Sequence, residues 1–171
     1  MPSNIEIKAV LKNRPAVEAI AARLADHGPE LIHQEDIFFN CDGARLKLRI
    51  FAPDRGELIR YQRDNVAETR RSRYLIAHTS DPHVLLDILT QTLGTVGIVR
   101  KARTLYLIGQ TRVHLDQVDN LGDFLELEVV MRDGQSEEEG KRIAEDLLSR
   151  FGIAKDDLLA EAYVDLILQK K

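Results

Sequence analysis

Several short segments of the sequence alternate charged and apolar residues, and within each segment the charges share one sign. Residues 45–49 read Arg-Leu-Lys-Leu-Arg, and residues 125–129 read Leu-Glu-Leu-Glu-Val. Alternation with a period of two places the charged side chains on one face of a β-strand and the apolar side chains on the other. Like charges on one face repel unless a counter-charge lies between them. The pattern therefore predicts a β-sheet with one strongly charged face that binds ions of opposite sign.

The charges also separate into blocks along the chain. Residues 45–73 hold nine basic and four acidic residues, and residues 97–112 hold four basic and no acidic ones. Residues 116–139 hold nine acidic residues and one basic residue. The formal net charge is only −4, which argues against a protein that coats nucleic acid. Solvated surfaces also carry runs of charge, so the blocks alone leave open whether they form a site.

Length and composition predict a single domain over residues 1–171. A chain of 171 residues is long enough to bury one sizeable core. The single cysteine, Cys41, has no partner for an internal disulfide, and no Cys/His cluster has the spacing of a zinc site. There is no run of 18 apolar residues and no signal-peptide pattern at the N-terminus. We therefore expect a cytoplasmic protein that contacts neither membrane nor nucleic acid.

Hydrophobic periodicity predicts about eight strands with helices at the ends. The strands are expected at Asn4–Leu11, Leu31–Asn40, Arg45–Phe51, Glu57–Arg63, Ser72–Thr79, Val96–Ile108, Thr111–Val118 and Phe124–Met131. The helices are expected at Ala16–His27, stopped by Gly28-Pro29, and at Asp81–Leu93, Ser136–Phe151 and Lys155–Leu168. Ser136 and Glu139 are spaced as a capping box. This order indicates an α+β fold with a mostly antiparallel sheet.

Closing such a sheet into a barrel would place the charged faces inside and the apolar faces outward against helices. The third helix has apolar residues for this purpose, for example Ile143, Leu147 and Leu148. Inside, rows of Lys and Arg would bind a polyanion, and rows of Glu and Asp would bind a hard divalent cation, Mg²⁺ or Mn²⁺. Phosphoryl and nucleotidyl transfer need this combination of positioning and charge neutralisation.

An ordered set of motifs resembles the CYTH superfamily, the triphosphate tunnel metalloenzymes that include class IV adenylate cyclases and thiamine triphosphatases. The family's N-terminal Glu-x-Glu-x-Lys corresponds to residues 4–8, Asn-Ile-Glu-Ile-Lys, where Asn4 replaces the first Glu. Further matches are residues 43–49, Tyr61-x-Arg63, Ser72-x-Tyr74, Lys101-x-Arg103, Arg112-x-His114-Leu115-Asp116 and Gly122-x-Phe124-x-Glu126-x-Glu128. The last two motifs look most like the class IV cyclase branch. The resemblance implies a closed eight-stranded antiparallel tunnel and suggests a homodimer.

The resemblance also implies roles for individual residues. The implied metal ligands are Glu6, Glu126 and Glu128, with Asp116 as a second metal ligand or a group that orients the nucleophile. The implied triphosphate-binding residues are Lys8, Arg45, Lys47, Arg49, Arg63, Lys101, Arg103 and Arg112. Lys8 and Asp116 are the expected catalytic residues. Because Asn4 supplies a carbonyl oxygen but no carboxylate, we expect metal binding that is weakened or altered rather than lost.

Three functions follow from these expectations. The first is an adenylate cyclase that converts ATP to cyclic AMP and pyrophosphate. The second is a triphosphatase that hydrolyses tripolyphosphate, thiamine triphosphate or a nucleoside triphosphate. The third is a non-catalytic binder of polyphosphate or nucleotide, which the Asn4 substitution allows. The sequence leaves the roles of Gln34, Asp36 and His114 open between the site and ordinary structural hydrogen bonding.

Overall fold

The computed structural model describes residues 2–63 and 69–170, and of Arg63 only the backbone. Within these ranges the strands are β1 (Ser3–Val10), β2 (His27–Phe39), β3 (Arg45–Ala52), β4 (Arg55–Arg63), β5 (Arg70–Thr79), β6 (Thr95–Ile108), β7 (Thr111–Val118), β8 (Gly122–Val130) and β9 (Leu158–Leu159). The helices are α1 (Arg14–Leu24), α2 (Pro82–Leu93), α3 (Glu137–Phe151) and α4 (Tyr163–Gln169), with a 3₁₀ turn at Lys155–Asp157. No helix in these ranges is long and apolar enough to cross a membrane.

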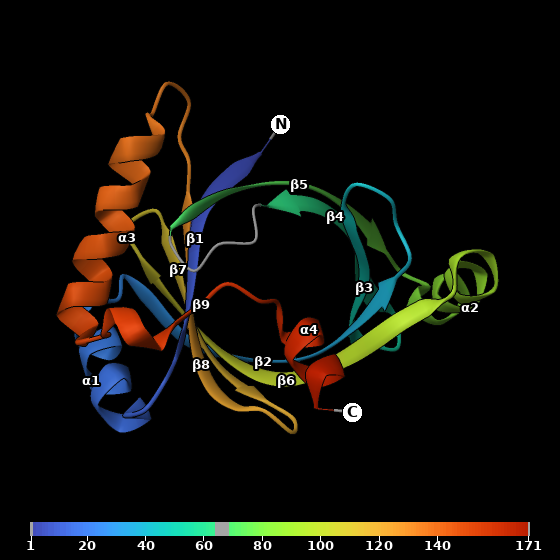
Figure 1. Ribbon diagram of the computed structural model, residues 1–171, viewed down its shortest axis with the longest axis horizontal. Coiled ribbons are helices and arrows are strands. Elements are labelled where there is room, and N and C mark those ends of the chain that lie inside the picture. The colour runs from blue at the N-terminus through green and yellow to red at the C-terminus, as the bar shows by residue number, and fades with distance from the viewer. Residues whose placement is uncertain (1, 64–68, 171) are drawn as a thin grey trace.

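The strands form one antiparallel sheet that closes on itself. Its order is β5-β4-β3-β2-β6-β7-β8-β1-β9, and β5 also pairs with β1. This second pairing makes a closed barrel of the first eight strands in that order, with β9 added beside β1. Figure 1 shows the barrel as a ring seen along its axis. The predicted eight-stranded antiparallel tunnel is confirmed.

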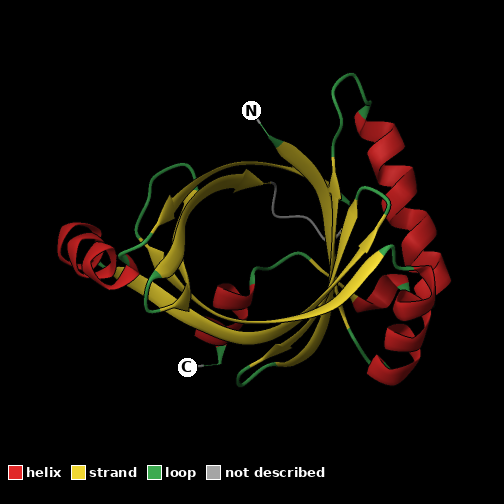
Figure 2. Ribbon diagram, turned by 180° about the vertical axis from the view of Figure 1, so that it is seen from behind, coloured by secondary structure: helices red, strands yellow, loops and turns green. Residues whose placement is uncertain are grey.

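The apolar faces of the strands point outward and are covered by helices, as the alternation predicts. Ile5 and Ile7 of β1 pack in one cluster with Leu147 and Leu148 of α3, to which α1 also contributes. A separate cluster joins α2 to β2 and β3 around the fully buried Leu48. Figure 2 shows these helices on the outside of the ring, at opposite sides. Each fully buried Leu or Ile contributes about 1.5–3 kcal/mol, so this packing is a major source of barrel stability.

Helix α3 lies unusually close to the barrel wall. A Cβ added at Gly140 would lie 2.7 Å from Cγ1 of Ile5 and 2.6 Å from Sδ of Met131. Only glycine allows this approach without displacement of the neighbours. The helix begins at the predicted capping box, in which Ser136 and Glu139 hydrogen-bond reciprocally. Its inward face is therefore fixed by both the cap and the glycine contact.

The prediction of one helix over Lys155–Leu168 is wrong. Leu158 and Leu159 instead form β9, which pairs with Lys8 and Ala9 of β1. Leu158 packs against the outer cluster under α3, whereas Leu159 packs against a cluster inside the barrel, so the two side chains point to opposite faces as in any strand. Helix α4 starts only at Tyr163.

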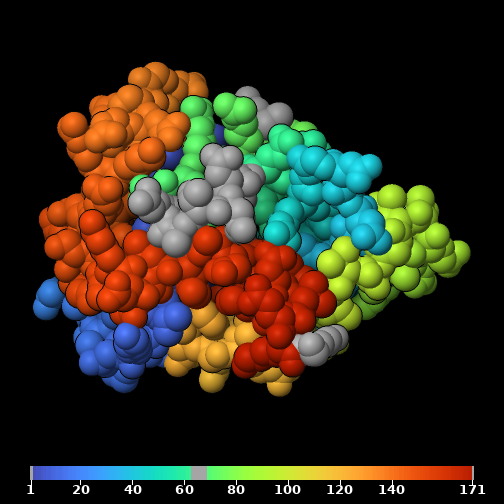
Figure 3. All heavy atoms as spheres, viewed as in Figure 1, coloured from blue at the N-terminus to red at the C-terminus, as the bar shows by residue number. Residues whose placement is uncertain are grey.

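The C-terminal segment covers one end of the barrel. Ala162, Tyr163 and Val164 are buried in one cluster with inward residues of the strands, among them Phe38 and Phe124. In Figure 3 the red C-terminal segment crosses the face of the molecule that is seen along the barrel axis. This end of the barrel interior is therefore closed by apolar packing.

The prediction that Gly28-Pro29 stops the first helix is also wrong. Helix α1 ends at Leu24, and Gly28 and Pro29 belong to β2, which starts at His27. Pairing with β6 continues through this segment, with a register shift between the pairs of His27 and Glu30. The irregularity accommodates the proline, so pairing with a long neighbouring strand overrides the local turn signal.

Candidate functional site

A cavity of about 250 Å³ occupies the barrel interior. All eight barrel strands contribute inward side chains to it, and α4 contributes Tyr163. Of the predicted site residues, those that line the cavity are Glu6, Lys8, Lys47, Arg49, Lys101, Arg103, Arg112, Glu126 and Glu128. The period-two rule explains this, because each pair such as Lys101 and Arg103 lies two residues apart on one strand. The charged faces are thus inside the barrel.

The cavity wall mixes charged and apolar side chains. Its apolar members include Ile32, Phe51 and Ile76, and Ile76 is 43% exposed. Ile32 is the direct register partner of Arg103, so apolar and cationic side chains lie next to each other. A ligand with both an anionic and an organic part would meet groups of matching polarity.

Arg45, predicted to bind phosphate, is not among the described residues that line the cavity. It forms a bidentate contact with Asp165 of α4, at 3.0 and 2.7 Å between nitrogen and oxygen, which joins β3 to α4. The backbone of Arg63 ends β4 and pairs with Ser72, but the side chain of this predicted phosphate-binding residue lies outside the described part of the structure.

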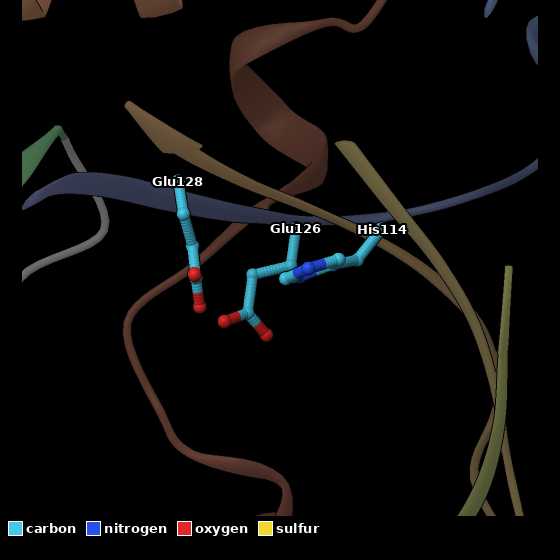
Figure 4. Close-up of side chains that lie close together, drawn as sticks. All are labelled: His114, Glu126 and Glu128. Carbon is cyan, nitrogen blue, oxygen red and sulfur yellow. The ribbon is translucent and has the colours of Figure 1, made fainter. Parts of the chain in front are cut away.

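Three potential metal ligands cluster on β7 and β8. One ligand atom from each of His114, Glu126 and Glu128 lies within 4.8 Å of the others. Figure 4 shows the two carboxylates and the imidazole directed toward one another. Glu6 lies opposite Glu128 in the strand register and contacts Arg70 at 3.4 Å. Carboxylate oxygens are the donors that hard divalent cations take, so this cluster fits a metal ion.

The two carboxylates of this cluster differ electrostatically. Burial raises the pKa of Glu126, but the charges of Lys8 and Arg103 outweigh burial and hold it well below its usual value. Burial, followed by the charge of Glu126, raises the pKa of Glu128. A cation between them would relieve the repulsion.

A buried acid pairs with the cations of β3. Asp36 of β2 is 2% exposed and accepts hydrogen bonds from Lys47 at 2.9 Å and from Arg49 at 2.8 and 2.9 Å. Burial would raise the pKa of Asp36, but Arg49 and Lys47 lower it well below its usual value. The sequence left this residue open, and its alternation with Gln34 on one strand face was the signal for its inward position.

Lys101 is a buried lysine whose amine is less basic than usual. Burial, followed by the charge of Arg103, lowers the pKa of Lys101 to about 7. Burial and Arg103 likewise hold the pKa of His114 well below its usual value, so its imidazole is neutral at neutral pH. A bound anion would favour the protonated form of Lys101.

Asp116, predicted as a second metal ligand or a group that orients the nucleophile, does not line the cavity. It is fully buried and accepts two hydrogen bonds of 2.7 Å from Arg103. Tyr163 donates a third, at 2.9 Å. These hydrogen bonds hold the Arg103 guanidinium against the Asp116 carboxylate.

Sequence reasoning missed Tyr163. Its ring lies under two predicted phosphate-binding lysines, with the centroid 4.0 Å from Nζ of Lys8 and 4.9 Å from Nζ of Lys101. These cation–π contacts fix the direction of both ammonium groups. The only available signal was that Tyr163 is the sole aromatic residue after Phe151.

A closed barrel with a cation-rich wall and an internal carboxylate cluster defines an ion-binding tunnel protein. The chain belongs to the CYTH domain family, which it matches over residues 3–163. Tunnel enzymes of this family generally depend on metal ions, and they are adenylate cyclase-like proteins or triphosphatases.

Individual relatives share the whole fold at low identity. A curated protein of Methanocaldococcus jannaschii, named "putative adenylate cyclase", is 24% identical over 95% of this chain and 97% of its own. A solved structure from Pyrococcus horikoshii covers 95% of this chain and 98% of its own, with a TM-score of 0.85 and 23% identity. A "putative adenylyl cyclase" from Hippeastrum, described as having a dominant triphosphatase activity, covers 98% and 96%, with a TM-score of 0.69 and 15% identity.

Proposed function

We propose that this protein is a divalent-metal-dependent enzyme that acts on a triphosphate inside the barrel, and that its reaction is the conversion of ATP to cyclic AMP and pyrophosphate. The observation that carries the proposal is that cations and apolar side chains share one cavity. Lys47, Arg49, Lys101 and Arg103 line it together with Ile32, Phe51 and Ile76. Inorganic tripolyphosphate needs only the cations, whereas a nucleotide uses both groups of side chains.

The cations that line the cavity would hold the triphosphate. Lys47 and Arg49 of β3 face the same cavity as Lys101 and Arg103 of β6. Such groups neutralise the charge that develops on the leaving pyrophosphate. Lys8 lies across the strand pair from Glu126, between the phosphate wall and the carboxylates. We propose that it binds the phosphate oxygen next to the metal.

The carboxylates would hold the metal ion, Mg²⁺ or Mn²⁺. We propose Glu6, Glu126 and Glu128 as ligands, all of which line the cavity. When bound, such an ion neutralises phosphate charge and lowers the pKa of a coordinated hydroxyl or water. Asp116 would keep the Arg103 guanidinium aimed into the cavity through its two hydrogen bonds. Asp116 thus acts through Arg103 rather than on the substrate.

Triphosphate hydrolysis is the second candidate. The side chains of Ile32, Phe51 and Ile76 offer no donor or acceptor for a purine, so they would favour any apolar group rather than adenine in particular. The activity described for the Hippeastrum protein, which shares this fold, also favours hydrolysis. In that reaction water attacks the terminal phosphorus, with the same metal and phosphate ligands.

The two reactions are separated by their products. Purified protein is incubated with ATP or with tripolyphosphate, each with Mg²⁺ or Mn²⁺, and the products are resolved by chromatography. Cyclic AMP with pyrophosphate supports the cyclase. Orthophosphate from tripolyphosphate, without cyclic AMP from ATP, contradicts it and supports the hydrolase. The Glu126→Ala/Glu128→Ala variant is the control for metal dependence, and metal-dependent binding without turnover would indicate a binding protein.

A further inference from the structure

The carboxylate cluster contains a nitrogen donor that the proposed metal site does not use. His114 of β7 is the direct neighbour of Glu126 of β8 in the strand register. Its ligand nitrogen lies within 4.8 Å of the ligand oxygens of Glu126 and Glu128. In Figure 4 the imidazole projects from its strand toward the Glu126 carboxylate. The cluster is therefore a mixed nitrogen and oxygen donor set.

The imidazole is also incompletely satisfied. His114 is 4% exposed, and its Nδ1 has no hydrogen-bond partner among the described residues. A buried polar atom without a partner costs about 1–3 kcal/mol, and a group bound in the cavity would supply the partner. Asn4, which replaces the first glutamate of the N-terminal motif, presents a second such atom, Oδ1, and lines the same cavity.

The surroundings favour a neutral ligand at this position. Arg103 contacts Glu126 at 3.5 Å, and Arg112 contacts Glu128 at 3.0 Å. A further carboxylate would attract these arginines, which would then compete with the metal ion for the carboxylate. An imidazole adds a ligand atom without adding negative charge. It thus leaves the arginines available for phosphate.

We propose that His114 is a ligand of the tunnel metal and that, with Glu126 and Glu128, it makes a site selective for first-row transition ions such as Mn²⁺ over Mg²⁺. Imidazole nitrogen suits transition ions, whereas Mg²⁺ takes oxygen donors almost alone. The inference deepens the proposed function and rests on its metal site. It concerns the identity of the ion and one of its ligands.

The decisive measurement is the nitrogen coupling of bound Mn²⁺, which needs no substrate. Protein labelled with ¹⁵N-histidine is loaded with Mn²⁺ alone and measured by pulsed electron paramagnetic resonance. We expect a directly bound ¹⁵N in the wild type that disappears in His114→Gln. His33 is exposed on the outer face of β2, and His33→Gln should keep the coupling. Absence of histidine coupling in the wild type would overturn the proposal.

Titration calorimetry with metal alone tests the selectivity. We expect His114→Gln to lose at least about tenfold in Mn²⁺ affinity and less than about threefold in Mg²⁺ affinity. Equal losses for both ions would contradict the selective role. Thermal unfolding without metal shows whether His114→Gln folds. His114→Asn is measured in parallel and replaces His114→Gln if that variant does not fold. Cyclic AMP formation with Mg²⁺ and no nitrogen coupling would refute this inference alone, whereas nitrogen coupling without turnover would refute the proposed function alone.

Discussion

Asp36 is a single buried residue that partly neutralises the cations proposed to bind phosphate. It accepts hydrogen bonds from Lys47 and Arg49 and is 2% exposed. Without it, two buried cations on adjacent positions of one strand face would repel each other in a low-dielectric interior. Its presence therefore stabilises the empty barrel and at the same time competes with a phosphate for the same cations.

Replacement of Asp36 should separate these two effects. We expect Asp36→Asn to lower the free energy of unfolding by about 3 kcal/mol, because it leaves buried charges uncompensated. Saturating tripolyphosphate should restore much of this loss by supplying the counter-charge. Urea unfolding with and without tripolyphosphate measures both changes. Glu35→Gln is the matched control, since Glu35 pairs on the outer face with the exposed Arg100 and should change stability by less than about 1 kcal/mol.

We predict that Lys101 makes the proposed phosphate binding dependent on pH. Its pKa is lowered to about 7 by burial and then by Arg103, so above that pH the empty barrel holds mostly the neutral amine. A bound polyanion raises this pKa, and binding therefore takes up a proton. We expect affinity for tripolyphosphate to fall as pH rises above about 7. Calorimetry in buffers of different ionisation enthalpy measures the proton uptake.

Two variants test whether Lys101 is the group that titrates. Lys101→Arg keeps a permanent charge and should take up fewer protons than the wild type on binding. Lys12→Met is the control, because Lys12 is exposed and pairs with Asp157 away from the cavity. Unchanged proton uptake in Lys101→Arg would assign the pH dependence to another group.

At the scale of elements, the strands were predictable and the C-terminal segment was not. The period-two pattern places Thr111–Val118 as the structure has it and gives the inward direction of residues such as Lys47. The pattern is a reliable guide because a slip of one residue in register would turn the charged side chains outward against the helices. Leu158 and Leu159 carry no such mark, since both are leucines and their opposite faces are set by two clusters formed elsewhere. Tyr163 was missed for a similar reason, because its position is set by the cluster into which it packs and not by a local sequence pattern.

The fit of α4 against β6 depends on Gly97. A Cβ at this position would lie 2.8 Å from Cγ2 of Val164. We expect Gly97→Val to destabilise the protein by about 2 kcal/mol and to increase hydrogen exchange in α4 relative to α3. Ala102→Val on the outward face of the same strand is the control and should leave exchange in α4 unchanged. Equal exchange in both variants would mean that α4 is held by other contacts.

At the scale of the whole molecule, the net charge of −4 hides pairs of opposite charge that neutralise one another inside the barrel. Arg112 contacts Glu128 at 3.0 Å, and Arg103 contacts Glu126 at 3.5 Å. A triphosphate would draw the cations toward itself and leave the carboxylates available for a metal ion. Because coupling between two ligands is reciprocal, metal and triphosphate should each strengthen the binding of the other.

Glu126→Gln should therefore affect triphosphate binding with opposite signs in the two conditions. Without metal, the variant lacks the carboxylate that competes for Arg103, and we expect it to bind tripolyphosphate at least about fivefold more tightly than the wild type. With Mn²⁺ it lacks a ligand, and we expect binding at least about tenfold weaker than the wild type. Asp123→Asn is the control, because Asp123 contacts Arg14 at 3.3 Å and does not line the cavity. If both affinities shift in the same direction, the carboxylate acts on the phosphate alone. Only a site that metal and phosphate share would make the variant bind more tightly than the wild type without metal and more weakly with it.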